Sequence, residues 1–219
     1  MYTQAVKQRL RKTADPCEKC GLHRTLCLCD LIPRLDLKMH VTLLIHAKEL
    51  KRTTNTGTLA LHALVNSDLF VRGVKPVLGV DPPVLSHRLL QGYQPLLFFP
   101  ADEATELTEA FARTLKMPVQ LLVPDGNWRQ ASKVHSRHPE LANVPRVKIS
   151  TPNLGQLHLR AEHTVEGMAT LEAIARAVGI LESRVAETAL LALYREKLER
   201  TTIGRQGRID QSIYGKTKG

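Results

Sequence analysis

The four cysteines of this chain stand close together, at Cys17, Cys20, Cys27 and Cys29, with the spacing C-x2-C-x6-C-x-C. Four thiolates brought together by tight turns suit a tetrahedral metal ion, and Pro16 supplies turn chemistry beside the first pair. A closed shell of four sulfurs leaves no open coordination position for catalysis. The spacing therefore predicts a structural zinc site that orders an N-terminal segment with little apolar content of its own.

Three other uses of these cysteines are alternatives to a zinc site. Disulfides are disfavoured because the chain has no cysteine elsewhere to bridge to and because the charged N-terminus, unlike a secretory signal, indicates the cytoplasm. A redox C-x-x-C pair normally follows a strand and opens a helix, and it would not need Cys27 and Cys29. An iron–sulfur cluster stays open as an alternative, since four thiolates also bind iron.

Two carboxylates stand where apolar runs end. Asp125 lies just after the run 119–123, and Glu49 lies shortly after the run 39–46. Open α/β sheets bind ligands beyond the carboxyl ends of their strands, so both carboxylates are candidates for proton transfer. The structural alternatives are a helix cap for Asp125, because Asx side chains accept hydrogen bonds at helix N-termini, and a surface charge for Glu49.

The elements that must position these residues alternate in type along the chain. The apolar pattern predicts strands at 39–46, 77–80, 95–99, 119–123 and 147–150. It predicts helices at 56–66, from the Asp81-Pro82-Pro83 turn to Gln91, at 102–116 and at 128–138, and two C-terminal helices with core stripes at 171–181 and 190–198. Such alternation indicates an α/β fold with a largely parallel sheet.

The charge balance indicates a polyanionic partner. The chain carries 31 Lys and Arg against 21 Asp and Glu, a net charge of +10, with the excess gathered towards both ends of the sequence. The aromatic fraction of 4% argues against a broad stacking platform for single strands. Frayed, solvated ends would give the same pattern, so charge alone does not select RNA or DNA. No apolar run is long enough to cross a bilayer, and no membrane partner is expected.

The order of short motifs along the chain resembles the DTW-domain family, named for an Asp-x-Thr-Trp motif. The resemblance runs from the cysteines to about Glu182, and each motif is weak alone but specific in this order. The motifs are the C-x2-C-x6-C-x-C stretch, His46-Ala47-Lys48-Glu49, Thr54-Asn55-Thr56-Gly57, Leu97-Phe98-Phe99-Pro100, Asp125-Gly126-Asn127-Trp128-Arg129-Gln130-Ala131, Leu159-Arg160 and Thr170-Leu171-Glu172-Ala173.

Two positions depart from the family pattern. Asn127 stands where the family has the threonine of its name, and Ala47 stands where a proline is expected. Asn, Ser and Thr are all good helix N-caps, so a capping role survives at Asn127. A contact that requires the threonine hydroxyl would be lost at Asn127.

The resemblance implies both a fold and an activity. The family is similar to the SPOUT class, which implies a trefoil knot in the C-terminal half that holds S-adenosylmethionine. Its bacterial members are tRNA-uridine aminocarboxypropyltransferases, which implies transfer of the 3-amino-3-carboxypropyl group of S-adenosylmethionine to N3 of a tRNA uridine (acp3U) with release of methylthioadenosine. The expected organisation is a basic, zinc-binding segment (1–35), an α/β domain (36–200) and a basic, mobile tail (201–219).

Site roles follow residue by residue from the matching motifs. Asp125 is the candidate base for the N3 proton, and Glu49 is the second choice. The S-adenosylmethionine pocket is carried over to Phe99, Pro100, Asp125, Gly126, Asn127, Trp128, Thr170, Leu171 and Glu172. The expected RNA contacts are Arg129, Lys133, Arg137 and Arg160. The expected partner is tRNA, and a monomer is favoured because the basic helices show no self-complementary apolar face.

Two other functions remain open at this stage. A SPOUT-type methyltransferase would use the same co-substrate but release S-adenosylhomocysteine. A zinc-stabilised RNA-binding protein without catalysis would need the cysteines but not Asp125.

Overall fold

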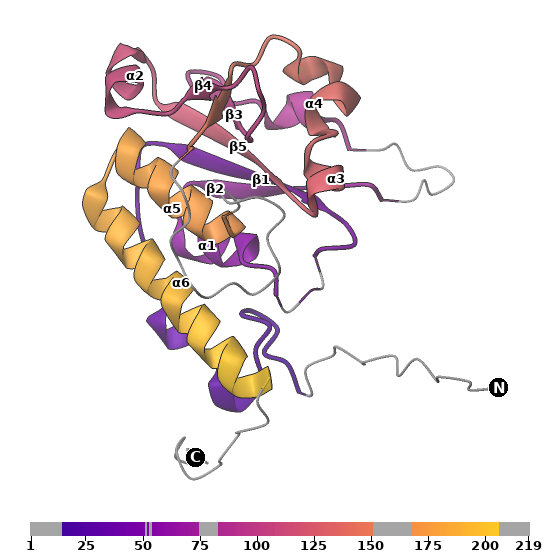
Figure 1. Cartoon of the computed structure of the whole chain (residues 1–219), viewed down its shortest axis with the longest axis vertical. Coiled ribbons are helices and arrows are strands. Elements are labelled where there is room, and N and C mark those ends of the chain that lie inside the picture. Colours follow the sequence, from indigo (N-terminus) through magenta and orange to yellow (C-terminus); the bar gives the residue numbers. More distant parts are fainter. Residues whose placement is uncertain (1–14, 51, 53, 75–82, 151–167, 206–219) are drawn as a thin grey trace, which may run out of the picture.

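The computed structural model describes residues 15–50, 52, 54–74, 83–150 and 168–205, and its centre is one sheet of six parallel strands (Figure 1). The strand order is β2-β1-β5-β3-β6-β4. The strands are β1 His40–His46, β2 Ser67–Arg72, β3 Gln94–Phe98, β4 Thr105–Glu106, β5 Val119–Asp125 and β6 Arg146–Lys148. The expected α/β class with a parallel sheet is confirmed.

The central strands are buried on both faces. All seven residues of β5 are buried, as are the five inner residues of β1, which is why both read as mainly apolar runs without alternation. Two buried polar residues inside these strands, Gln120 and Thr42, pair with each other: the Gln120 amide nitrogen donates to Thr42 Oγ1 at 2.9 Å, and the Gln120 oxygen accepts from the Leu90 N–H at 2.9 Å.

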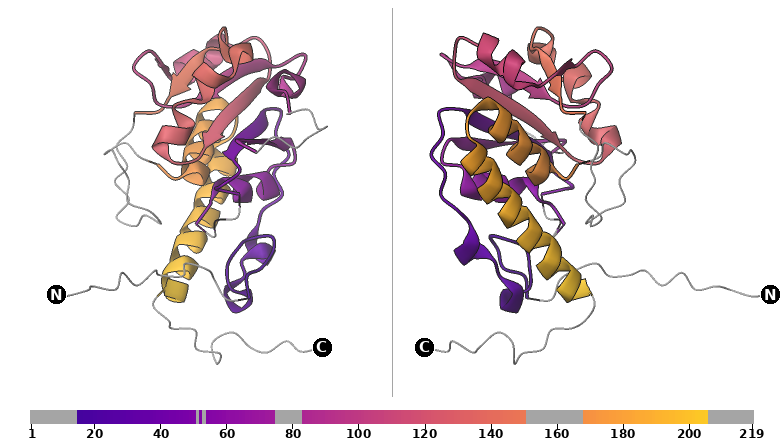
Figure 2. Two further views of the ribbon diagram at one scale, coloured as in Figure 1. Left: turned by 90° about the vertical axis from the view of Figure 1, so that its right-hand side faces the viewer. Right: turned by 60° about the vertical axis from the view of Figure 1, so that its left-hand side comes forward.

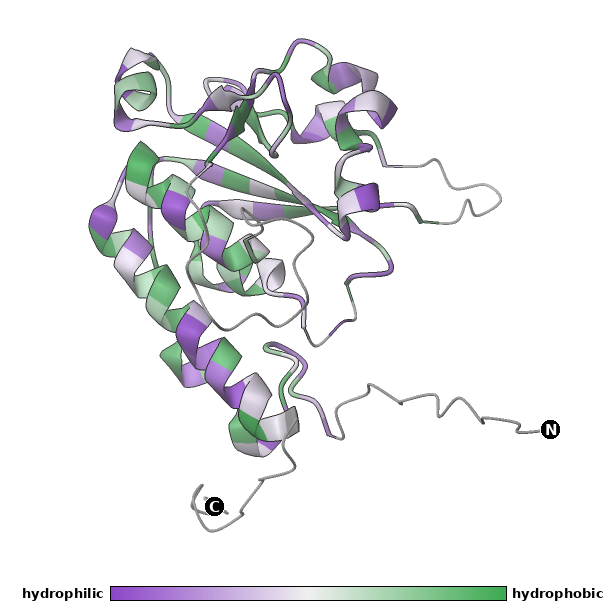
Figure 3. Cartoon of the chain, viewed as in Figure 1, coloured by the Kyte–Doolittle hydropathy of each residue, from purple (hydrophilic) through white to green (hydrophobic). Residues whose placement is uncertain are grey.

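Helices cover the two faces of the sheet unequally (Figure 2). The larger core lies under α1 (Gly57–Ala63), α5 (Thr170–Leu181) and α6 (Arg184–Arg205), and includes Leu43 and Ile45 of β1. The smaller core, on the opposite face, includes Leu44 of β1 and packs under the short helix α4 (Val134–Arg137) and two 3-10 turns, Leu85–Arg88 and Pro139–Leu141; another short helix, α3 (Trp128–Ala131), precedes α4. Figure 3 shows these apolar strands in green between the two helical layers.

The cysteine segment shares the larger core. Two 3-10 turns, Arg24–Leu26 and Cys29–Leu31, carry Leu26 and Leu28 into the same apolar cluster as Leu193 of α6. The segment therefore packs along the C-terminal half of α6 (Figure 2).

Several predicted elements are confirmed within a residue or a few at each end: β1, β3, β5, β6, α1, α5 and α6. The predicted strand 77–80 lies outside the described residues, and β2 was not predicted. In place of a helix from the Asp81-Pro82-Pro83 turn to Gln91, the described part forms only the 3-10 turn at Leu85–Arg88. Residues 201–205, expected in the tail, continue α6, and the rest of the tail lies outside the described residues.

The continuous helix predicted at 102–116 is wrong. Residues Thr105–Glu106 instead form β4 beside β6, and Leu107 is buried. Helix α2 (Glu109–Thr114) begins only after Thr108, whose hydroxyl caps it by accepting from the Phe111 N–H at 3.1 Å. The helix predicted at 128–138 is likewise two short helices, α3 and α4. In the described part of the chain, we find no helix that is both long and apolar enough to span a membrane.

Candidate active site and metal centre

The carboxyl ends of the strands gather the polar residues that sequence analysis singled out. Because all six strands are parallel, β1, β2 and β5 end at the same edge of the sheet. In the register of the sheet, Ile45 lies opposite Asp125, and His46 lies opposite Arg72. This edge is the candidate active site.

Asp125 forms a polar node that joins three segments of the chain. Its Oδ2 accepts a hydrogen bond from the Asn55 side-chain amide at 2.5 Å, and its Oδ1 accepts one from the Thr170 hydroxyl at 2.7 Å. Asn55 in turn accepts from the Thr58 N–H at 3.1 Å, so it caps the first turn of α1. The node fixes the end of β5, the loop before α1 and the start of α5. Asp125 is 6% exposed.

Close packing around the node explains a glycine. A Cβ at Gly57 would lie 3.0 Å from Asp125 Oδ2 and 3.0 Å from the Leu43 side chain. Any larger residue would therefore push the first turn of α1 away from Asp125. The Leu171 N–H adds a second link between the two helix starts by donating to Thr56 Oγ1 at 3.2 Å.

Asn127, the departure from the family motif, caps α3. Its side-chain oxygen accepts from the Gln130 N–H at 2.9 Å, and the Gln130 side chain accepts from the Asn127 N–H at 2.8 Å, which completes a capping box. The capping role expected for Asn127 is confirmed. Asp125, for which capping was the structural alternative, is the node instead.

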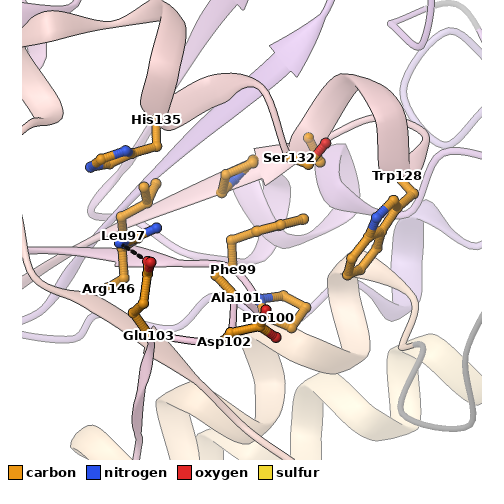
Figure 4. Close-up of a pocket in the computed structure, with 12 residues that line it drawn as sticks. Leu97, Phe99, Pro100, Ala101, Asp102, Glu103, Trp128, Ser132, His135 and Arg146 are labelled. Carbon is orange, nitrogen blue, oxygen red and sulfur yellow. Dashed lines mark hydrogen bonds and ion pairs between the residues drawn. The ribbon is translucent and has the colours of Figure 1, made fainter.

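An aromatic-walled pocket of about 310 Å³ lies at the end of β5, where Pro124 and Trp128, on either side of Asp125 in the sequence, form part of its wall (Figure 4). The rings of Phe99 and Trp128 have their centroids 5.0 Å apart and are tilted by 42°. Trp128 is 46% exposed, so its indole is available to a ligand. The pocket lining consists of Leu97, Phe99, Pro100, Ala101, Asp102, Glu103, Pro124, Trp128, Ala131, Ser132, His135 and Arg146.

The residues carried over from the family separate into groups in the structure. Phe99, Pro100 and Trp128 line the pocket. Asp125 and Thr170 belong to the node. Gly126 and Asn127 form the turn that connects Asp125 to Trp128. Leu171 is buried in the larger core, and Glu172 pairs with Arg176 at 2.9 Å.

The charged residues predicted to act in catalysis or RNA binding differ in their exposure. Glu49 is fully buried and lies 3.2 Å from Arg52 Nε, so it is not a surface charge. The predicted RNA contacts Arg129, Lys133 and Arg137 are exposed on or beside α3 and α4, and Arg160 lies outside the described residues. The role of Asn55 in the node is not apparent from its residue type, although the Thr54-Asn55-Thr56-Gly57 motif is a signal for this loop.

The four cysteine sulfurs fit one tetrahedral metal ion. All four lie within 4.8 Å of one another, and three of the sulfur pairs are 3.5, 3.6 and 3.8 Å apart. A tetrahedron with metal–sulfur bonds of about 2.3 Å has edges of about 3.8 Å. A backbone hydrogen bond from Cys20 lowers the pKa of Cys17 to about 6, whereas burial raises the pKa of Cys27 and of Cys29.

Two cations of α6 face the cysteine loop. Lys197 is fully buried, and its Nζ donates to the Cys20 carbonyl at 2.6 Å. The Arg200 guanidinium donates to the Cys27 carbonyl. Burial lowers the pKa of Lys197 to about 8, while the neighbouring thiols act in the opposite direction. A divalent ion with four thiolates carries a net charge of about −2, which these two cations would offset.

Comparison with known proteins agrees with this description. The DTW domain family matches residues 14–202, most of the chain. The relatives found include proteins named tRNA-uridine aminocarboxypropyltransferase 2. The one from Drosophila melanogaster is 27% identical over 180 residues (78% of this chain and 71% of the relative). The one from Macaca fascicularis is 25% identical over 186 residues (83% and 62%), and the one from Mus musculus is 26% identical over 181 residues (81% and 60%).

The matched regions thus cover 71%, 62% and 60% of the lengths of these three relatives. No solved structure matches the chain. The family match spans the cysteine cluster, the node, the pocket and most of α6, and the chain therefore belongs to the DTW domain family.

Proposed function

We propose that this protein transfers the 3-amino-3-carboxypropyl group of S-adenosylmethionine to N3 of a uridine in tRNA. The names of its relatives supply the reaction class and the tRNA substrate. The observation that carries the proposal is that the carboxyl end of β5 bears an anchored carboxylate, Asp125, next in sequence to Pro124 and three residues before Trp128, which both line an aromatic pocket.

The chemistry defines what the site must do. Bound S-adenosylmethionine supplies an electrophilic methylene carbon next to a sulfonium. The N3 proton of uridine passes to a base, the N3 lone pair forms the new N–C bond, and the C–S electron pair stays on sulfur as methylthioadenosine leaves. The protein must therefore hold a base near N3 and fix which sulfonium substituent faces it.

Asp125 is the proposed base. The two donors hold the carboxylate in one orientation, and hydrogen bonds to its ionised form favour that form. They occupy two of the roughly four lone-pair positions of a carboxylate. Both of these donors are uncharged side chains. Glu49 is the second candidate, and its carboxylate is paired with Arg52 at 3.2 Å.

The aromatic pocket is proposed to hold the planar and cationic parts of the substrates. Phe99 and Trp128 offer ring faces for stacking, and an indole face also attracts a cation such as a sulfonium. Pro100 and Pro124 add to the same wall. Because Leu171 faces the core and Glu172 pairs with Arg176, their proposed part is to hold Thr170 against Asp125.

The remaining parts of the molecule serve this site. We propose zinc as the ion of the cysteine cluster, with a structural role, and Arg129, Lys133, Arg137 and Arg160 as tRNA contacts. We also propose that the 36–200 domain contains a SPOUT-like trefoil knot; segment 151–167, which leads into α5, lies outside the described residues. A monomer acting on tRNA in the cytoplasm is the proposed working form.

Product analysis tests the proposal against its alternatives. The purified protein is incubated with S-adenosylmethionine and an unmodified tRNA transcript, and the small-molecule product and the tRNA nucleosides are identified by mass spectrometry. Methylthioadenosine together with acp3U is the expected result. S-adenosylhomocysteine with a methylated nucleoside would replace the proposal with a methyltransferase, and tRNA binding without either product would indicate a binding protein.

A further inference from the structure

A cluster of basic side chains lies beside the node, over the ends of β1 and β2. His46 and Arg72 end these strands, Lys48 follows β1, and Arg137 is the last residue of α4, near enough for its charge to act on His46 and Arg72. The charges of Arg72, Lys48 and Arg137 all act on the His46 ring, and that of Arg137 acts on Arg72. Like charges gathered in this way repel one another unless an anion lies among them.

The acidic groups nearby are already engaged with other residues. Glu49 and Asp125 are the two carboxylates whose charges reach the cluster, on His46 and Arg72 respectively. Glu49 pairs with Arg52, and Asp125 accepts from Asn55 and Thr170. Among the described residues, Lys48, Arg72 and Arg137 form no ion pair.

Arg72 is a buried guanidinium held by neutral acceptors. It is 6% exposed, and it donates from Nε to the Leu44 carbonyl at 3.2 Å and from Nη2 to the Gln130 carbonyl at 2.9 Å. Its Nη1 has no hydrogen-bond partner among the described residues. Burial and the charge of Arg137 lower the pKa of Arg72. A buried cation is costly without a counter-charge, so this arrangement is typical of a site that receives an anion.

His46 offers one more donor. Its Nδ1 accepts a hydrogen bond from the Lys48 N–H at 3.2 Å, which places the proton of the neutral ring on Nε2. Burial and the neighbouring cations lower the pKa of His46 and favour this neutral form. A Cβ at residue 73 would lie 2.7 Å from Nε2, and Gly73 has a φ of +69°, so the glycine keeps that nitrogen uncovered.

We infer that His46, Lys48, Arg72 and Arg137 form a phosphate-binding site that takes a backbone phosphate of the tRNA beside the modified nucleotide. The inference rests on the proposed function. The site lies next to the catalytic edge, because His46 neighbours the residue paired with Asp125 and Arg72 Nη2 approaches Gly126.

The exposure of the cluster favours a polymer over a small anion. Lys48 and Arg137 are exposed, and Arg129 and Lys133 continue the positive charge across α3 and the start of α4. A single carboxylate, such as that of the co-substrate, needs one guanidinium, whereas a polyanion that crosses the surface needs this succession of cations. The ligand assigned to this site is therefore a phosphate of the RNA backbone.

The test measures binding of an unmodified tRNA transcript to the full chain at several salt concentrations between about 50 and 300 mM KCl, by fluorescence anisotropy. Lys48→Gln, Arg137→Gln and the double variant are compared with Lys116→Gln, an exposed lysine just before β5 at the opposite edge of the sheet. Each single change should lower the slope of log affinity against log salt by about 0.7–1, and the double change by about 1.4–2. The double variant should bind about tenfold more weakly at low salt, with an unchanged thermal melt.

Gly73→Ala supplies an independent readout, because a Cβ only 2.7 Å from Nε2 displaces the His46 ring without removing a charge; a thermal melt checks that the variant stays folded despite the φ of +69°. It should weaken tRNA binding with a salt slope near that of the wild type. A double variant whose slope equals that of Lys116→Gln would overturn the inference. So would a double variant that loses affinity for S-adenosylmethionine alone, measured by calorimetry, while its tRNA slope stays unchanged. The binding assay needs no turnover. If the wild-type protein makes no methylthioadenosine but the double variant still shows the reduced salt slope, the phosphate site is supported and the proposed function is refuted.

Discussion

Thr170→Val tests the node by removing one hydrogen bond and little else. The valine replaces the hydroxyl by a methyl group of similar size, so Asp125 Oδ1 loses the donor at 2.7 Å while Asn55 still donates to Oδ2. Hydrogen bonds to charged groups contribute about 1.5–3 kcal/mol. For a chain of this size, that free energy of unfolding corresponds to a melting temperature lower by about 3–12 °C. Because Asp125 retains one donor, we expect the lower half of that range.

Differential scanning calorimetry measures the shift, with Thr170→Ser as the matched control. The serine keeps the hydroxyl and loses one methyl group, which costs up to about 1 kcal/mol. Methylthioadenosine release should fall in Thr170→Val and stay near the wild-type rate in Thr170→Ser, since only the former frees Asp125 to reorient. Equal melting temperatures for wild type and Thr170→Val would refute the reasoning that the node stabilises the join between β5 and α5.

Three further predictions concern other parts of the molecule. Chelation should release about one zinc ion per chain, measured by elemental analysis, and lower the melting temperature, because Lys197 and Arg200 dock α6 on the cysteine loop; an unchanged melt would contradict the structural role of the metal. Trp128→Ala should slow product formation about 2- to 10-fold, and Trp128→Phe should restore most of it, because stacking contributes about 0.5–1.5 kcal/mol; equal rates in both would count against the pocket. Burial acts to raise the pKa of Asp68, but hydrogen bonds and the charges of His40 and Arg88 outweigh it and lower that pKa, so Asp68 stabilises the fold while it is ionised. Asp68→Asn should therefore be less stable than wild type in urea at pH 7; the difference should start to shrink as the pH falls below about 3.9 and be lost once the pH passes through the lowered pKa of Asp68. A difference that does not shrink in acid would contradict this.

The fold class was predictable because the central strands are covered on both faces. In β1 and β5 the apolar run has no polar interruption of the kind that alternation produces, so the pattern identifies a buried parallel strand. The prediction fails at the edges of the sheet. In β2 only Phe70 and Arg72 are buried, and one of these is charged, so the apolar run in the sequence is only the three residues from Leu69 to Val71.

Helical periodicity also gives a wrong prediction where a strand and a short helix follow one another with the apolar spacing of a single long helix. Leu107, Phe111 and Leu115 are spaced as on one helix face, yet Leu107 belongs to the extended chain after β4. Only the part of this spacing that follows Thr108 belongs to a helix. Thr108 can act as the N-cap because the chain before it is extended rather than helical. That distinction depends on pairing between β4 and β6, which lie about forty residues apart in the sequence.

The candidate site was predictable in its motifs but not in its contacts. Asp125 and Trp128 were identifiable because they follow a clear strand, and the cysteines because of their spacing. The partners of buried polar residues are set by tertiary structure: Asn55 is 70 residues from Asp125, and Lys197 is 177 residues from Cys20. No local pattern marks such a lysine or amide as buried, which is why Arg72 and Lys197 had no predicted role.

The most direct test of the central claim is the rate of methylthioadenosine release in a single turnover by Asp125→Asn. The replacement amide can accept from Asn55 and donate to the Thr170 hydroxyl, so the fold and the affinities for tRNA and S-adenosylmethionine should be retained, but it cannot take the N3 proton. We expect a rate lower by about 10²- to 10⁴-fold at saturating substrates. A rate within twofold of wild type, with Glu49→Gln inactive, would contradict the assignment of Asp125 as the base.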